Sequence, residues 1–253
     1  MSRSSPSSAD GRFPPTSLGA AAYRQAVASG DLVAARVRVK ETDILVSAMV
    51  DLGQRADTLV RRYRARIEQY IAGHPNFARA LVPLERDAAA PDIVGAMIAA
   101  GAQAGVGPMA AVAGAIAEFV GRELGPRSRD VIVENGGDIF VRSLAPRQML
   151  LLAEDSEFEG MRIALPPSPE ALGIGTSSGT TGPSLSFGRA DAVMAVAPSA
   201  ALADAAATAV ANVVQGPADL AVGVARARQI GVDGVVIVAG GKLAAWGQIE
   251  LAG

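Results

Sequence analysis

Cysteine is absent from this 253-residue chain, and histidine occurs once, as His74. Without thiols the chain can form no disulfide, no thiolate zinc or iron–sulfur centre and no cysteine nucleophile. A Ser-His-Asp triad or a multi-histidine metal site would depend on this single imidazole. His74 stands between Gly73 and Pro75, a position typical of a helix C-terminal turn, where an imidazole caps free carbonyl groups. Acid–base chemistry is therefore expected from carboxylates.

Charge of either sign is also scarce. Charged residues make up 19% of the chain, the formal net charge is −2 and the pI is near 5.5. This balance gives no electrostatic footprint for nucleic acid, so we expect no nucleic-acid partner. The basic cluster over residues 55–66 is interpreted as the solvated face of an amphipathic helix, with a phosphate-binding or partner surface as the alternative.

Long apolar runs are missing, although half of the residues are apolar. The longest, residues 195–211, is interrupted by Pro198, Ser199 and Asp204, and no segment reaches the roughly 18 residues of a membrane span. Residues 1–17 are rich in Ser and Pro without the apolar segment of a signal peptide, which predicts a disordered tail and a cytoplasmic protein. The apolar remainder predicts one domain over residues 18–253 with a large core or a buried homodimer interface.

Hydrophobic periodicity predicts a β-hairpin over residues 32–50, a helix over 54–72 and a strand pair around Gly136-Gly137. It also predicts a helix that starts at Pro91-Asp92 and runs into residues 101–107, and another over 109–124. A short strand is also indicated over 21–27. Further strands are predicted at 149–152, 161–165, 173–176, 192–197 and 235–238, with helices over 200–214 and 217–229 between the last two strands. This order favours an α+β fold with a mixed, largely antiparallel sheet and helices packed on one face.

Polar clusters interrupt the apolar segments at four places. Gly105 to Met109 precedes a helix and could bind an anion; alternatively, its Gly and Pro residues only mark the start of the helix. Glu134 to Asp138 brings two carboxylates and a carboxamide around a Gly pair, which is also a good hairpin turn. Residues 175–184 form a loop without apolar side chains, either around a polar ligand or mobile on the surface. Asp204 and Thr208 share a helix face at i,i+4 spacing and make a plausible partial Mg²⁺ site, unless Asp204 is paired or exposed.

Together these strings resemble the ApbE-like superfamily, which contains the FAD:protein FMN transferases. Val39 to Asp43, Gly107 to Gly114, Val133 to Asp138 and Ser184 to Gly188 look like its soluble, uncharacterised branch. The resemblance implies an ApbE-like fold of two related halves, with Mg²⁺ near Asp204 and Thr208 and a flavin or pterin nucleotide beside the glycine-rich and Ser/Thr segments. The expected ligand-binding residues are Gly107, Pro108, Met109, Asn135, Gly136, Gly137, Thr176, Ser177, Ser178, Gly179, Ser184 and Ser186.

The chain departs from the transferases at two places. Gly107-Pro108-Met109 stands where they carry Ala-Lys-Gly, and their His-x-x-Asp-Pro-x-Thr-Gly segment is absent. These departures argue against FMN transfer to a protein threonine. The leading hypothesis is a pocket for a flavin, pterin or similar planar heterocycle with Mg²⁺-dependent transferase or hydrolase chemistry. Acid–base candidates are Glu134, Asp138, Glu41 and Asp43. The alternatives are a non-catalytic homo-oligomeric assembly protein and a metal-dependent enzyme acting on another nucleotide.

Overall fold

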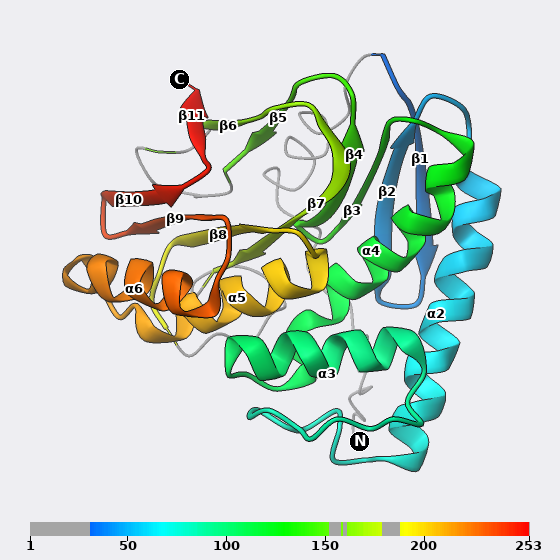
Figure 1. Ribbon diagram of the computed structural model, residues 1–253, viewed down its shortest axis with the longest axis horizontal. Helices are drawn as coiled ribbons and strands as arrows, with labels where there is room; N and C mark the ends of the chain where they lie inside the picture. The colour runs from blue at the N-terminus through cyan, green and yellow to red at the C-terminus, as the bar shows by residue number, and fades with distance from the viewer. Residues whose placement is uncertain (1–30, 152–157, 159–160, 179–187, 253) are drawn as a thin grey trace, which may run out of the picture.

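The computed structural model describes residues 31–151, 158, 161–178 and 188–252. Figure 1 shows one long sheet with helices packed on one face and a small second sheet on the other. The residues expected to form a tail (1–17) and a strand (21–27) lie outside the described ranges.

The first half of the chain runs from a hairpin through helices into a second hairpin. Its elements are β1 (Val33–Val39), β2 (Thr42–Ala48), α2 (Gly53–Gly73), α3 (Asp92–Ala104), η1 (Pro108–Ala111), α4 (Val112–Leu124), η2 (Gly125–Arg127), β3 (Val131–Asn135) and β4 (Asp138–Ser143).

The second half repeats this order of hairpin, helices and hairpin. Its elements are β7 (Ser168–Ser177), β8 (Ala192–Ala197), α5 (Ala200–Val213), η3 (Pro217–Asp219), α6 (Leu220–Ile230), β9 (Gly234–Ala239) and β10 (Lys242–Gly247). Each half contributes four adjacent strands to the eight-stranded sheet, in the order β1-β2-β3-β4-β7-β8-β9-β10. The expectation of two related halves is confirmed at the level of topology.

The small sheet consists of β5 (Arg147–Leu150), β6 (Arg162–Leu165) and β11 (Glu250–Ala252), in the order β11-β6-β5. Every strand pair among the described residues is antiparallel. The predicted α+β class with helices on one face is confirmed. The sheet was expected to be mixed, but it contains no parallel strand pair in the described ranges and is antiparallel there.

Side-chain alternation divides the core into two layers. Along β3, Val131 and Val133 pack toward the helices, whereas Ile132 packs toward the small sheet. The helix-side layer is the larger and takes in the apolar stripe of α2, which is Ala56, Leu59, Val60, Tyr63 and Ile67. Since both faces of the central strands are covered, their sequences are apolar at consecutive positions.

Helix ends follow the predicted local chemistry, with one exception. α2 ends at Gly73, and the backbone N–H of His74 donates to Tyr70 while its Nδ1 lies 3.1 Å from the same carbonyl oxygen, which confirms the capping role. The single helix expected over 109–124 is wrong at its start. A 3₁₀ turn over 108–111 precedes α4, because the backbone at Ala111 (φ −118°, ψ 4°) leaves the helical region.

Strands β10 and β11 were not predicted. A Gly pair with positive φ, Gly240 at 54° and Gly241 at 71°, joins β9 to β10 and is a recognisable hairpin signal. Among the described residues no single helix has the length and apolarity to cross a membrane. α3 and the stretch from Pro108 to Arg127 meet that criterion only as a pair, bent by 106°.

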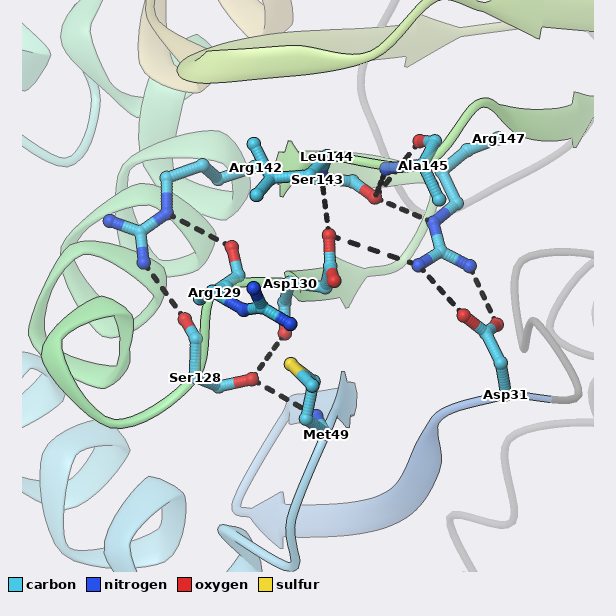
Figure 2. Close-up of polar contacts among 10 residues, drawn as sticks. All are labelled: Asp31, Met49, Ser128, Arg129, Asp130, Arg142, Ser143, Leu144, Ala145 and Arg147. Atoms are coloured by element: carbon cyan, nitrogen blue, oxygen red, sulfur yellow. Dashed lines mark hydrogen bonds and ion pairs between the residues drawn. The ribbon is translucent and has the colours of Figure 1, made fainter.

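A buried arginine joins the small sheet to the large one (Figure 2). The side chain of Arg147 is 6% exposed, donates to Ser143 Oγ at 2.7 Å and pairs with Asp31 at 2.7 Å. Asp130 Oδ1 lies 3.9 Å from Arg147 Nη2 and accepts from the Leu144 N–H. Burial alone would raise the pKa of Asp130, but hydrogen bonds from Ser143 and Leu144 and the charge of Arg147 hold that pKa below its usual value.

We predict that Arg147→Met destabilises the fold by roughly 3 kcal/mol, because it leaves the buried Asp130 carboxylate without its cation. Chemical denaturation at neutral pH measures this change. Arg162→Met on neighbouring β6 removes an exposed guanidinium that, among the described residues, is bonded only to Gln148, and it is the control, with an expected change within about 0.5 kcal/mol. Equal losses in the two variants would contradict a role for the buried cation.

Candidate functional site

The candidate site lies where the β3–β4 turn and the end of β7 meet α4 and α5. Asn135 and Asp138 are direct cross-strand partners on either side of Gly136 and Gly137, so their side chains share one face. That face is the helix side, because Asn135 Nδ2 donates to the Ala113 carbonyl oxygen of α4 at 3.0 Å. The two glycines have φ of +66° and +105°, which makes a tight two-residue turn accessible.

Helix α5 is seated unusually close to its neighbours. A Cβ on Gly175 would lie 2.1 Å from the Ala203 carbonyl carbon, and a Cβ on Gly173 would lie 2.2 Å from the Ala200 nitrogen. On the other side, a Cβ on Gly114 of α4 would lie 2.1 Å from the Ala200 carbonyl oxygen. Because these three positions lack side chains, the backbones of β7 and α4 contact α5 directly.

This close seating places Asp204 deep inside the protein. Asp204 is 6% exposed, and its Oδ2 accepts a hydrogen bond from the Gly114 N–H at 2.9 Å. Thr208, one turn further along α5, is also buried. The helix begins with Ser199, whose hydroxyl accepts from the Leu202 N–H as an N-cap. The i,i+4 pair predicted from the sequence therefore faces the interior.

Asp138 is the second carboxylate of this cluster. It is 4% exposed, and its Oδ1 accepts from the Thr176 N–H at 3.0 Å. Burial, followed by the negative charge of Asp204, raises the pKa of Asp138 well above 3.8. Burial raises the pKa of Asp204 to about 7, even though the N–H groups of Gly114 and Ala113 stabilise its charged form. Among the residues that the structure describes, no Lys, Arg or His forms an ion pair with either carboxylate.

A buried hydroxyl without a partner lies on the same side of β7. Ser177 alternates with Gly175, so its side chain points toward the helix face. It is buried, and its Oγ forms no hydrogen bond with any residue that the structure describes. An unsatisfied buried hydroxyl is unfavourable by about 1–3 kcal/mol, which makes it a candidate ligand contact.

The donors in this cluster suit a hard cation. Carboxylate, hydroxyl and backbone carbonyl oxygens are the ligands that Mg²⁺ takes, usually one or two carboxylates with other oxygens completing the shell. The described ranges contain no group of three or more His, Cys, Asp or Glu that could hold a metal. A cation here would therefore rest on Asp138 and Asp204, with Thr208 and non-protein oxygens. Two uncompensated buried carboxylates fit such a cation.

The glycine-rich segment before α4 packs more tightly than a free anion-binding loop. A Cβ on Gly107 would lie 1.7 Å from the Ala80 carbonyl oxygen, so Gly107 is fixed against the 75–90 loop. Pro108 is buried at the start of η1, and Met109 packs at the edge of the core. Their assignment to a nucleotide pocket stays a prediction.

Three of the predicted acid–base residues lie outside the Asp138–Asp204 cluster. Glu134 is on the opposite face of β3 from Asn135, and its Oε1 accepts from the Gly137 N–H at 2.9 Å, so it fastens the turn. Glu41 is exposed and pairs with Arg64 of α2. Asp43 pairs with Arg36 and Arg38 on β1. All three belong to the same end of the sheet as the cluster, but their carboxylates are engaged elsewhere.

The Ser/Thr segment is only partly described. Thr176 lies on the sheet face away from the helices, beside Gly137, whose Cβ would be 2.3 Å from the Thr176 Oγ1. Ser178 is half-buried. Gly179, Ser184 and Ser186 fall outside the described residues. Sequence reasoning did not assign Gly114, Gly173 and Gly175 to the site; the signal available for the last two was Gly-x-Gly within a strand.

Comparison with known proteins agrees with this architecture. A family model described as AbpE bacteria matches residues 24–242. The UPF0280 protein of Methanocella arvoryzae is 38% identical over 217 residues, covering 85% of this chain and 89% of the relative. The UPF0280 protein of Methanocaldococcus jannaschii is 41% identical over 186 residues, covering 72% and 75%.

Two solved structures share the fold at low sequence identity. A mutant of the flavin transferase ApbE from Vibrio cholerae superposes with a TM-score of 0.58 at 12% identity, covering 86% of this chain and 97% of that one. The ApbE protein of Thermotoga maritima gives 0.54 at 14% identity, covering 84% and 96%. The resemblance drawn from the sequence motifs is thus confirmed: the chain shares the fold of the ApbE structures, is similar to the UPF0280 proteins and belongs to the AbpE bacteria family.

Proposed function

We propose that this chain binds a phosphorylated planar heterocycle of the flavin or pterin class together with Mg²⁺, and that it catalyses Mg²⁺-dependent transfer or hydrolysis at the phosphate. The observation that carries the proposal is the buried Asp138–Asp204 pair, which has no cationic partner among the described residues. Membership in a family that shares the fold of flavin transferases supports the ligand class.

Four side chains have distinct roles in this proposal. Asp204 and Thr208 would hold the cation, with Asp138 as the second carboxylate. Bound Mg²⁺ would neutralise negative charge on phosphate oxygens. The raised pKa of Asp138 suits it to hold a proton in the cation-free protein and to release that proton when a positive charge arrives. The Ser177 hydroxyl supplies a hydrogen bond to the ligand.

Backbone hydrogen bonds fix the positions of the Asp138 and Asp204 carboxylates before any ligand binds. The Gly114 N–H holds one oxygen of Asp204, and the Thr176 N–H holds one oxygen of Asp138. These hydrogen bonds hold each carboxylate in a fixed orientation. Such preorganisation reduces the entropic cost of binding a cation.

The first test is calorimetric titration of FAD, FMN and a pterin monophosphate, with and without Mg²⁺. We expect Mg²⁺ to tighten binding of at least one of them, and Asp204→Asn to weaken that Mg²⁺-dependent binding by about tenfold or more, since a cation-binding charge is lost. Asp57→Asn removes an exposed carboxylate paired with Arg61 on α2 and should leave binding unchanged. Affinities weaker than about 1 mM for all three ligands would overturn the proposal.

A second prediction concerns the unpartnered hydroxyl. Ser177→Ala should leave the free energy of unfolding unchanged or raise it by up to about 1 kcal/mol, because an unsatisfied buried hydroxyl disappears. The same variant should weaken ligand binding by about fivefold. Ser47→Ala, which removes another unpartnered buried hydroxyl on β2, should match it in stability but not in affinity. Equal affinities for the two variants would remove Ser177 from the site.

The third prediction is a pH dependence in the absence of divalent cations. Asp204 has a folded-state pKa of about 7 against 3.8 in its unfolded form. Its contribution to stability is therefore fully present below about pH 4 and is lost as the pH rises toward 7. We expect the free energy of unfolding of the natural protein, relative to Asp204→Asn, to fall by on the order of 2 kcal/mol between about pH 5 and pH 8. A parallel pH profile for the two proteins would show that Asp204 is already charged when the site is free.

A further inference from the structure

A second concave site lies at the other end of α4, away from the Asp138–Asp204 cluster. It is an open depression of about 300 Å³, lined by Met49, Val50, Gly125, Pro126, Arg127, Ser128 and Arg129. The residues come from the segment after β2 and from η2 and the loop before β3. A volume of this size is at the lower limit of small-molecule pockets.

Hydrogen bonds hold the loop that forms the wall of this cavity (Figure 2). The Arg142 guanidinium donates to the carbonyl oxygens of Gly125 and Ser128, the latter at 2.8 Å. The Ser128 hydroxyl accepts from the Met49 N–H at 3.0 Å and donates to the Asp130 carbonyl oxygen. The backbone of the loop is thus satisfied internally, and its shape does not depend on a ligand.

The two arginines of the loop are exposed, and the charge of Arg129 acts on the neighbouring Asp130 without a direct ion pair. Arg127 and Arg129 alternate about the extended Ser128, and both side chains are exposed. Neither guanidinium forms an ion pair or a hydrogen bond with any residue in the described ranges. Most arginines of α2, by contrast, are paired with carboxylates, as Arg61 is with Asp57 and Arg62 with Glu123.

The floor of the cavity is apolar. Met49 is 44% exposed and Val50 is 49% exposed, and both follow the end of β2. Two exposed guanidinium groups and two exposed apolar side chains line the same depression, and this combination favours a ligand with a doubly negative head and an apolar body. Guanidinium groups match the oxygens of a phosphate in both charge and planar geometry.

We propose that this cavity, formed by the η2–β3 loop and the end of β2, binds a small organic phosphate monoester, with the phosphate between Arg127 and Arg129 and the apolar group on Met49 and Val50. The site is separate from the Asp138–Asp204 cluster, and this proposal does not rest on the function proposed for that cluster.

The test is titration of the full chain with phenyl phosphate, inorganic phosphate and benzoate, followed by amide chemical shifts. Phenyl phosphate should bind most tightly and shift the Met49 and Ser128 amides. Arg127→Gln with Arg129→Gln should weaken it by about tenfold or more. Met49→Ser should weaken phenyl phosphate but not inorganic phosphate, because only the former contacts the floor.

Two controls identify the site. Arg79→Gln with Arg86→Gln removes two other exposed arginines without ion pairs, from the 75–90 loop, and should have no effect. Titration in EDTA, which removes divalent cations from the Asp138–Asp204 cluster, should also leave the affinity unchanged, and this separates the cavity from that cluster. Equal weakening by both arginine pairs, equal affinity for phenyl phosphate and inorganic phosphate, or binding only to vesicles containing phosphatidic acid would overturn the proposal.

Discussion

The close seating of α5 against β7 and α4 is the constraint on which the rest of the structure depends. Gly173 and Gly175 bring the strand backbone to the first turns of the helix, and Gly114 does the same from α4. Any side chain at these positions would push α5 outward by an ångström or more. Because eight of the 14 residues of α5 are alanines, the helix packs by close backbone approach, and its one acid, Asp204, lies in the interior.

The buried acid gives the site its chemistry. Asp204 belongs to the second half of the fold, whereas Asp138 belongs to the β3–β4 hairpin of the first half. The cluster therefore lies where the two four-stranded halves of the sheet join. Two buried carboxylates without a cation raise each other's free energy in the charged state. A bound Mg²⁺ with a phosphate would relieve that repulsion, which makes the cation part of the proposed ligand rather than an accessory to it.

Local patterns in the sequence were enough to predict α2 with its His74 cap, the first hairpin and the Gly136-Gly137 turn, because nearest neighbours determine these features. The two-residue turn also fixes Asn135 opposite Asp138 and sends Glu134 to the other face, an inference that strand alternation allowed but that was not drawn. The meeting of Asp138 with Asp204 could not be read from spacing, since it depends on how two halves of the sheet join. The involvement of Glu41 and Asp43 was likewise not decided by sequence; the structure engages both with arginines outside the cluster.

The central claim is that the Asp138–Asp204 pair holds a proton when free and a cation when occupied. Calorimetric titration of Mg²⁺ into the protein with FAD, in two buffers of different ionisation enthalpy near pH 7, measures the protons released on binding. We expect net release, because a cation would displace the proton that these two carboxylates retain owing to their raised pKa. Binding heat that is independent of the buffer, or no Mg²⁺ binding at all, would contradict it.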